Sequence, residues 1–429
     1  MKKIMKSFFI VLIITLSLSA CQVAPSTVLA QSDKPRDTQP QVSSSDSAVL
    51  VAGNSTFAFD LYHRLKDEPD NLFFSPYSIS IALAMTYAGA AGDSESQMAQ
   101  AMHFDLPQAQ LHPAFNKLSL ELDQRTSAEG IDSTKAFKLH VVNATWGQTG
   151  FAFLPGYLDI LAEDYGAGIR LLDFSANPEN ARSTINQWVS RETENKINDI
   201  LPVGSIDTLT RLVLSNAIYF KADWANEFDK GLTQEDVFHL LAGGTTTVPM
   251  MNRTGFYNYA AGAGYQALEL PYAGGQLSML VILPDEGQFA QVASSLNLTI
   301  LEGIVSSLQS TNVDLTLPKF TFEYDLGLKG WLQQLGMTDA FDATRADFSG
   351  MNGKKDLYIS DALHKAFVAV DEAGTEAAAA TTVIVGVTSA PSEQPIAFKA
   401  DRPFIFLIRD IPTGTILFLG NLMNPAPAK

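Results

Sequence analysis

The residue types that carry most enzyme chemistry occur in this 429-residue chain, but their spacing forms no catalytic pattern. The six histidines are scattered singly, and a lone cysteine excludes both an internal disulfide and a cysteine-based metal cluster. The sequence contains no nucleophile elbow, no HExxH motif and no phosphate-cradling glycine loop. We therefore expect a protein that is not an enzyme and that uses no metal and no cofactor.

The single cysteine, Cys21, lies where its thiol has one specific chemistry. Three lysines near the N-terminus precede an apolar stretch at 7–19, which is short for a membrane span. The sequence LSAC at 18–21 resembles the lipobox of bacterial lipoproteins, in which cleavage exposes the cysteine for lipidation. We therefore expect a lipoprotein signal peptide at 1–20 and lipidation of Cys21. The alternative is an ordinary signal peptide that is cut later, for example after Ala30.

The segment that follows the cysteine is rich in Ser, Gln, Pro and Asp, and it has too little apolar surface to fold alone. We expect a flexible tether at 21–48 and a folded body at 49–429. The formal net charge is −17, which disfavours nucleic acid and heparin-like polyanions as partners. We expect an extracytoplasmic protein that is anchored to the cell envelope through its lipid alone, or is secreted.

The body mixes helices and strands without regular alternation, and no linker divides it. Capping residues indicate helix starts at Asn54 or Ser55, at Ser75-Pro76 and at Asn177-Pro178. An apolar run at 211–220 is typical of a central strand, and turn residues predict hairpins at 268–283 and 404–419. The pattern indicates a single α+β domain.

The stretch GTEAAAATTVIVGV, at 374–387, combines two opposed local preferences. Its residues 376–380 are strong helix formers, whereas residues 381–385 are β-branched and favour a strand. After Glu376 it contains no charge and no bulky side chain. Such a conflict is expected of a segment that has two states. The alternative is an ordinary helix that continues into a strand.

With its flanks (DALHKAFVAVDEAGTEAAAATTVIVGVTSAPS, 361–392), this stretch resembles the reactive-loop region of the serpin family. Five further segments resemble serpin segments in the same order: 71–90 (NLFFSPYSISIALAMTYAGA), 212–224 (LVLSNAIYFKADW), 268–284 (LELPYAGGQLSMLVILP), 317–341 (LPKFTFEYDLGLKGWLQQLGMTDAF) and 403–425 (PFIFLIRDIPTGTILFLGNLMNP). The resemblance extends over 49–429. It implies a serpin fold of class α+β, with three β-sheets, about eight or nine helices and an exposed reactive-centre loop.

The resemblance implies inhibition of serine proteases. The protease attacks the loop and forms an acyl-enzyme, and the loop inserts as a new strand into the central sheet before hydrolysis. Inward-facing side chains of that strand must be small and uncharged, because bulk or charge in a close-packed interior is costly. The family's hinge corresponds to Glu372, Gly374, Thr375, Glu376, Ala377, Ala378, Ala379, Ala380 and Thr381. On the family's pattern, Glu376 would face solvent in the inserted strand, and the inward-facing residues would be Thr375, Ala377, Ala379, Thr381 and Val383.

The family's spacing also locates the cleaved bond. Counting fifteen residues from the hinge glycine gives Thr388, so the resemblance implies a reactive bond between Thr388 and Ser389. Because loop lengths vary, Val387 and Ser389 are neighbouring candidates. A small β-branched residue suits elastase-like and subtilisin-like proteases, whereas trypsin requires Arg or Lys. Lys399 and Arg402 lie too far along the chain to be the bait.

Other residues take roles from the family one at a time. The buried polar cluster that controls sheet opening corresponds to Ser75, Ser78, Asn216 and His364. The region where the loop enters the sheet corresponds to Trp224, Lys319 and Glu372. Ala222 and Ala373 depart from the family's usual Gly and acidic or Lys residue, and both departures are mild. The resemblance implies a monomer whose partner is a target serine protease.

Two other classes of function are compatible with parts of this reading. A non-inhibitory serpin would act as a binding or scaffold protein, and such members tend to carry Pro, charge or bulk in the hinge. Residues 375–382 carry nothing of that kind except Glu376. A solute-binding lipoprotein would need a two-lobed α/β pattern with parallel strands, which the sequence does not indicate.

Overall fold

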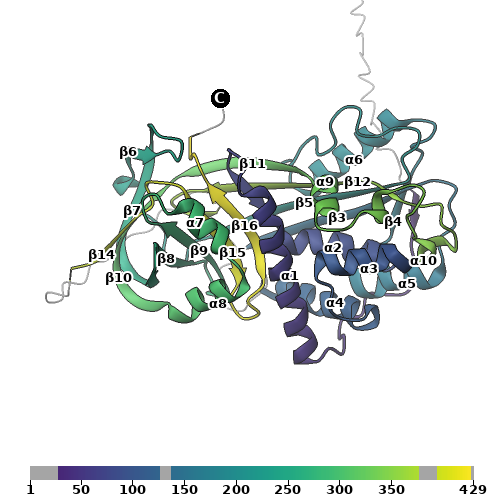
Figure 1. Cartoon of the computed structure of the whole chain (residues 1–429), viewed down its shortest axis with the longest axis horizontal. Helices are drawn as coiled ribbons and strands as arrows, with labels where there is room; N and C mark the ends of the chain where they lie inside the picture. The colour runs from purple at the N-terminus through teal and green to yellow at the C-terminus, as the bar shows by residue number, and fades with distance from the viewer. Residues whose placement is uncertain (1–27, 126–136, 376–393, 427–429) are drawn as a thin grey trace, which may run out of the picture.

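The computed structural model describes residues 28–125, 137–375 and 394–426 (Figure 1). The expected signal peptide, Cys21, the hinge residues 376–381 and the bond between Thr388 and Ser389 lie outside these ranges. Within them, ten α-helices accompany two hydrogen-bonded sheets. The α+β class expected from the sequence is confirmed.

Capping residues define where several helices begin. Ser75 accepts a hydrogen bond from the backbone N–H of Ser78 at 3.1 Å, and Asn177 accepts one from Asn180, as expected. The first helix instead begins at Ser44, because the side chain of Ser43 caps it by accepting a hydrogen bond from the backbone N–H of Asp46. Asn54 and Ser55, the expected start, lie inside this helix and are buried. The helices are α1 (Ser44–Leu65), α2 (Pro76–Tyr87), α3 (Gly92–Met102), α4 (Gln108–Arg125), α5 (Pro155–Tyr165), α6 (Pro178–Glu192), α7 (Phe289–Ser295), α8 (Leu298–Ser307), α9 (Leu328–Gln334) and α10 (Ser349–Asn352).

The first sheet has seven strands and holds the expected central strand. Its order is β1 (Val28–Ala30), β4 (Ile169–Leu172), β3 (Lys138–Gln148), β5 (Leu212–Asp223), β13 (Gly374–Thr375), β12 (Ile359–Val370) and β11 (Phe320–Gly327). β5 is buried along most of its length, which explains its apolar sequence. β5 and β12 pair in parallel as far as Tyr219 and Phe367, and β13 lies between them beyond that point.

The second sheet has nine strands. Its order is β14 (Ile396–Lys399), β10 (Gln309–Pro318), β7 (Thr245–Gly262), β8 (Tyr265–Pro271), β9 (Leu277–Pro284), β15 (Phe404–Asp410), β16 (Ile416–Leu422) and β2 (Leu72–Phe74), with β6 (Gln234–His239) paired to β7. The hairpins β8–β9 and β15–β16 confirm the two expected from turn residues. The resemblance implied three sheets. In the described residues the strands outside the first sheet form one hydrogen-bonded sheet, because the long β7 pairs with β6, β10 and β8.

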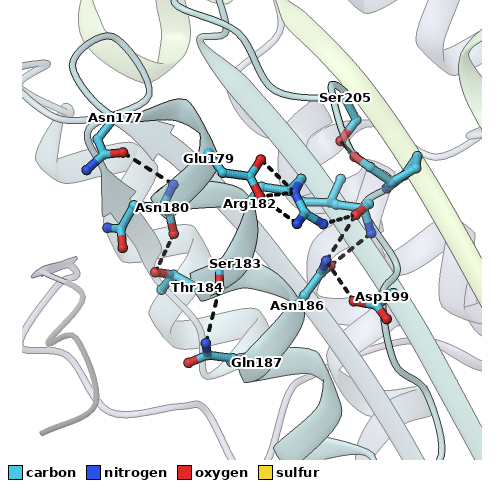
Figure 2. Close-up of polar contacts among 12 residues, drawn as sticks. Asn177, Glu179, Asn180, Arg182, Ser183, Thr184, Asn186, Gln187, Asp199 and Ser205 are labelled. Atoms are coloured by element: carbon cyan, nitrogen blue, oxygen red, sulfur yellow. Dashed lines mark hydrogen bonds and ion pairs between the residues drawn. The ribbon is translucent and has the colours of Figure 1, made fainter. Parts of the chain in front are cut away.

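Helix α6 covers one face of the seven-stranded sheet with a small core of its own, built around Trp146 and Trp188. Figure 2 shows how polar side chains tie this helix to the segment that follows it. Asn186 donates to the carbonyl of Leu201 at 3.0 Å and accepts from its N–H at 2.9 Å. Arg182 donates to the same carbonyl at 2.8 Å. The helix and the following segment therefore form one unit above the sheet.

The expected flexible tether is wrong for residues 28–48. Residues 28–43, which we call the N-terminal strap, add β1 to the free edge of β4 and then cross to α5 and α4. Asn116 is fully buried and donates to the carbonyl of Asp37 at 2.7 Å, while Arg36 donates to Asn116 at 2.8 Å. A segment with too few apolar residues for its own core is ordered by pairing with an existing sheet edge and buried polar partners.

Candidate functional site

The first residues of the expected hinge lie between two central strands. After Val370 the chain reverses, and Gly374 and Thr375 pair with Asp223 and Ala222 of β5, while Thr375 also pairs with Val370. A Cβ atom on Gly374 would lie 2.1 Å from the carbonyl oxygen of Ala222, so this close approach requires glycine. The sheet is therefore parted at this end by a two-residue strand.

Thr375 faces into the molecule, as the family pattern implied. Its side chain is fully buried, and its hydroxyl forms a 2.7 Å hydrogen bond with the hydroxyl of Tyr272. The Tyr272 ring stacks on Trp224, with 4.6 Å between ring centroids and 7° between planes. Thr375 thus lies in a buried, partly polar site formed by Tyr272 and Trp224, which we call its seat.

The reversal that precedes β13 is held by charged and backbone groups. The ammonium of Lys319 lies 2.7 Å from Glu372, whose other carboxylate oxygen accepts from the hydroxyl of Thr233 at 2.8 Å. Burial opposes ionisation of this carboxyl, but these hydrogen bonds outweigh it and hold the pKa of Glu372 below its usual value. Trp224 donates from its backbone to Ala373 and from its indole to Asp371.

The structure therefore brings together all the residues expected where the loop enters. It adds Thr233 and Tyr272, which the sequence analysis did not single out. Tyr272 directly follows β8, at the start of a glycine-containing turn, and nothing in that local pattern connects it with the loop. The connection is made in the tertiary structure, by the isolated β-bridge between Tyr272 and Trp224 and by the hydrogen bond to Thr375.

The expected buried polar cluster lies beneath the part of the sheet where β5 and β12 still pair. His364 lies opposite Asn216, forms a short side-chain hydrogen bond with it, and accepts from the backbone N–H of Ser75 at 3.1 Å. Asn216 donates to the hydroxyl of Ser78 at 2.6 Å. The structure adds Asn143 of β3, whose side-chain oxygen accepts hydrogen bonds from Ser78 and Asn216. The sequence could have indicated this residue, because an asparagine within a mostly apolar strand needs polar partners.

The protonation state of the cluster follows from its burial. Complete burial lowers the pKa of His364 to about 3, so the imidazole is neutral at physiological pH. Nε2 accepts from Ser75, and the proton therefore resides on Nδ1 and is donated to the carbonyl oxygen of Asn216. A strand entering between β5 and β12 must separate these two side chains. The cluster is thus positioned to control how far the sheet parts.

The next described strand is β14, where Phe398 is fully buried. The ammonium of Lys399 lies 2.9 Å from Asp236, and Arg402 donates to the carbonyl of Pro284 at 2.8 Å. Both basic side chains therefore contact the folded domain, and neither is expected to be the residue that the protease recognises. Across the described residues, no three acidic, histidine or cysteine side chains gather as metal ligands, and no helix is long and apolar enough to cross a bilayer.

Comparison with known proteins places this geometry in a family. The model of the family described as serpin (serine protease inhibitor) matches residues 52–425. An uncharacterised serpin-like protein of Thermococcus kodakarensis is 43% identical over 381 residues, covering 89% of this chain and 86% of that protein. Leukocyte elastase inhibitor A of Rattus norvegicus is 38% identical over 387 residues, covering 88% and 99%.

Solved structures agree with the sequence comparison. Antithrombin-III of Homo sapiens, a further relative, is 38% identical over 387 residues, covering 88% of this chain and 82% of that protein. The thermophilic serpin tengpin in its native state superposes with a TM-score of 0.81 at 29% identity, covering 93% of this chain and 99% of tengpin. Uncleaved ovalbumin gives a TM-score of 0.77 at 29% identity, covering 88% and 100%. The chain has the serpin fold and belongs to the serpin family.

Proposed function

We propose that this protein inhibits serine endopeptidases of elastase-like or subtilisin-like specificity. The protease serine attacks the carbonyl carbon of Thr388, the amine of Ser389 leaves, and the loop inserts into the seven-stranded sheet before the acyl-enzyme is hydrolysed. The observation that carries the proposal is the hinge: Gly374 and Thr375 already pair between β5 and β12. The first two residues of the segment that must enter the sheet are therefore already paired with it.

The physical requirement is a race between insertion and deacylation. A strand that extends a formed end avoids the costly first pairing, because its neighbours and register are already defined. The following residues 377–383 offer only alanine, threonine and valine to the sheet. Such side chains fit a close-packed interior without burying charge. The hinge therefore favours trapping over simple cleavage.

The expected protease class is supported by the small, β-branched Thr388. It is also supported by the similarity to proteins named leukocyte elastase inhibitor, at 37–38% identity. We further propose that the protein is a bacterial lipoprotein, with a signal peptide at 1–20 and a lipid on Cys21. It would work outside the cytoplasm as a monomer, held to the cell envelope through its lipid or secreted.

The decisive experiment mixes the chain from residue 22 onward with pancreatic elastase, subtilisin, chymotrypsin and trypsin in turn. Denaturing gels detect a covalent complex, and mass spectrometry identifies the released C-terminal peptide. We expect a stable complex with elastase or subtilisin and a peptide that begins at Ser389. Cleavage without any complex would reject inhibition and favour the second candidate, a non-inhibitory serpin that acts as a binding or scaffold protein.

A further inference from the structure

The hydroxyl of Tyr272 is unusual because the second sheet places it at the entrance of the first. Tyr272 lies in the turn between β8 and β9, whose geometry is held by hydrogen bonds from Tyr272 to Leu277 and from Gly275 to Tyr272. The same turn is tied to the end of β5, since Ala273 donates to the carbonyl of Asp223 at 2.8 Å. The phenol therefore has a fixed position relative to β5. Its hydroxyl forms a hydrogen bond with the hydroxyl of Thr375.

Among the described residues, no side chain other than Thr375 forms a hydrogen bond with this hydroxyl. The ring lies flat against Trp224 and edge-on to Phe220, at 5.2 Å between centroids. Tyr272 and Thr375 are both fully buried, and burial raises the pKa of the Tyr272 phenol well above its usual value. An unpaired hydroxyl in such a place is costly. The hydrogen bond between the two hydroxyls satisfies both groups, and it keeps Thr375 paired with Ala222 of β5.

This row has a consequence for the rest of the loop. Thr375 pairs with Ala222 on one side and Val370 on the other, and these two residues are 148 positions apart in the sequence. His364 and Asn216, which face each other across the closed part of the sheet, are also 148 positions apart. A strand that continues from Thr375 can therefore pair with both neighbours without either one slipping.

The same register determines which side chains enter the core. Side chains alternate along a strand, so residues an even number of positions after Thr375 share its inward face. The sixth residue after Thr375 is Thr381, and it would enter the row of Asn216 and His364. A slip of one residue would turn Glu376 inward instead and bury its charge.

We propose that Tyr272 is a positioning residue that seats Thr375 and thereby sets the register in which the loop enters the sheet. This proposal rests on the proposed trapping function. Tyr272 does not touch the cleaved bond. It acts through the hydroxyl of Thr375, which selects the inward face of the entering strand.

The first test removes one hydroxyl at a time. Tyr272→Phe keeps the stacked ring, and Thr375→Val keeps the side-chain shape, whereas Thr375→Ser keeps the hydroxyl. We expect the first two variants to raise the number of inhibitor molecules consumed per trapped protease by a factor of about 2 to 10. The rate constant of association should change little, and Thr375→Ser should behave like the unaltered protein. The double variant should be no worse than either single variant, because both lose the same bond.

A matched control separates positioning from stability. Tyr157 of α5 is also a buried tyrosine, and its hydroxyl donates to the carbonyl of Met85 at 3.2 Å. Tyr157→Phe removes a comparable bond far from the hinge strand and should leave the number of inhibitor molecules consumed unchanged. If Tyr272→Phe matches this control, the proposed role of Tyr272 is overturned.

The second test addresses the register itself. One alanine inserted between Thr375 and Glu376 moves every later side chain to the other face, and two inserted alanines restore the alternation. We expect the single insertion to convert the inhibitor into a substrate and the double insertion to recover part of the trapping. If loop length alone mattered, the double insertion would be the more damaging of the two, and that result would contradict the register argument.

A readout that needs no protease keeps the two proposals distinguishable. Hydrogen exchange of the backbone at 371–375 reports whether the hinge strand stays seated. We expect Tyr272→Phe to accelerate this exchange and Tyr157→Phe to leave it unchanged. If the unaltered protein forms no complex, the proposed inhibition fails, and hydrogen exchange still decides the seating. Unchanged exchange in Tyr272→Phe would reject the seating role.

Discussion

The surroundings of Thr375 limit the side chains that this position can hold. Thr375 is the last described residue before the range 376–393, and it pairs with Ala222 of β5. Its side chain is fully buried, and its hydroxyl forms a hydrogen bond with the hydroxyl of Tyr272. A charged side chain of greater length cannot be accommodated there without leaving the sheet.

We predict that Thr375→Arg folds normally but is cleaved without trapping the protease. The long charged side chain would keep the hinge out of the sheet, so deacylation would win the race. The measurement is the ratio of covalent complex to cleaved inhibitor on denaturing gels. Glu376→Arg is the matched control, because it introduces the same side chain at the outward-facing position implied by the family. Persistent trapping by Thr375→Arg would show that the hinge is interpreted wrongly.

The buried polar cluster depends on a neutral His364. Its folded-state pKa of about 3 lies below the ordinary value of 6.5, so the unfolded chain binds a proton that the folded protein does not. The stability from this group is complete above pH 6.5 and is lost as the pH falls towards 3. Below 6.5 the expected slope is about 1.4 kcal/mol per pH unit.

We predict that the free energy of unfolding falls between pH 7 and pH 5 less steeply in His364→Asn than in the unaltered protein. Denaturant titrations at pH 7, 6 and 5 measure both slopes. The comparison isolates His364, because the buried His112, with its pKa lowered to about 4, and His103, with its pKa raised by Asp60, are present in both proteins. Equal slopes would mean that His364 is not held neutral by its burial.

At the scale of elements, the N-terminal strap links parts of the molecule that belong to different layers. Its strand β1 pairs with the sheet edge, while its later residues contact α4 and α5. Asn116 is the buried junction, with bonds to Arg36, Asp37 and Glu163. Each of these groups would lose one hydrogen bond if the amide were removed.

We predict that Asn116→Ala lowers the free energy of unfolding by about 1–3 kcal/mol, because it removes the hydrogen bonds that the buried amide of Asn116 makes with Arg36 and Asp37. Asn180→Ala, on the exposed surface of α6 (Figure 2), is the control and should change stability by no more than about 0.5 kcal/mol. Denaturant unfolding measures both. Similar effects for the two variants would mean that the strap contributes little to the stability of the fold.

At the scale of the whole molecule, the sheet is held in a partly parted state. β5 and β12 form a parallel pair for most of their length, and only their ends flank the short β13. A full strand between them would add two antiparallel ladders and cover more apolar surface. We therefore propose that a more stable arrangement with an inserted strand exists, and that the chain reaches it only after cleavage.

We predict that cleavage at Thr388 with insertion of the loop strongly raises the thermal unfolding temperature. The rise should be well above the shift of about 2–4 °C that one kcal/mol produces in a domain of 150–250 residues. Circular dichroism melts before and after limited proteolysis with elastase measure the change. A melting transition that stays the same after clean cleavage would contradict an insertion mechanism.

Local patterns in the sequence were enough to predict much of the framework. The Ser75-Pro76 and Asn177-Pro178 helix starts, the apolar β5 and the two late hairpins are confirmed, because each depends on capping, turn chemistry or burial that neighbouring residues encode. The hinge and the polar cluster were predicted by family resemblance, and the structure brings their described members together. The reactive bond and the lipid anchor stay predictions.

The N-terminal strap, the seat of Thr375 and the register of the hinge could be seen only in the tertiary structure. The strap is ordered by a sheet edge more than 130 residues away in the sequence, so its polar composition was misleading. Tyr272 meets Thr375 because a turn of the second sheet is bonded to the end of β5, a contact across 103 positions. Local residue types determine which elements form, whereas contacts between distant elements decide which polar groups find partners.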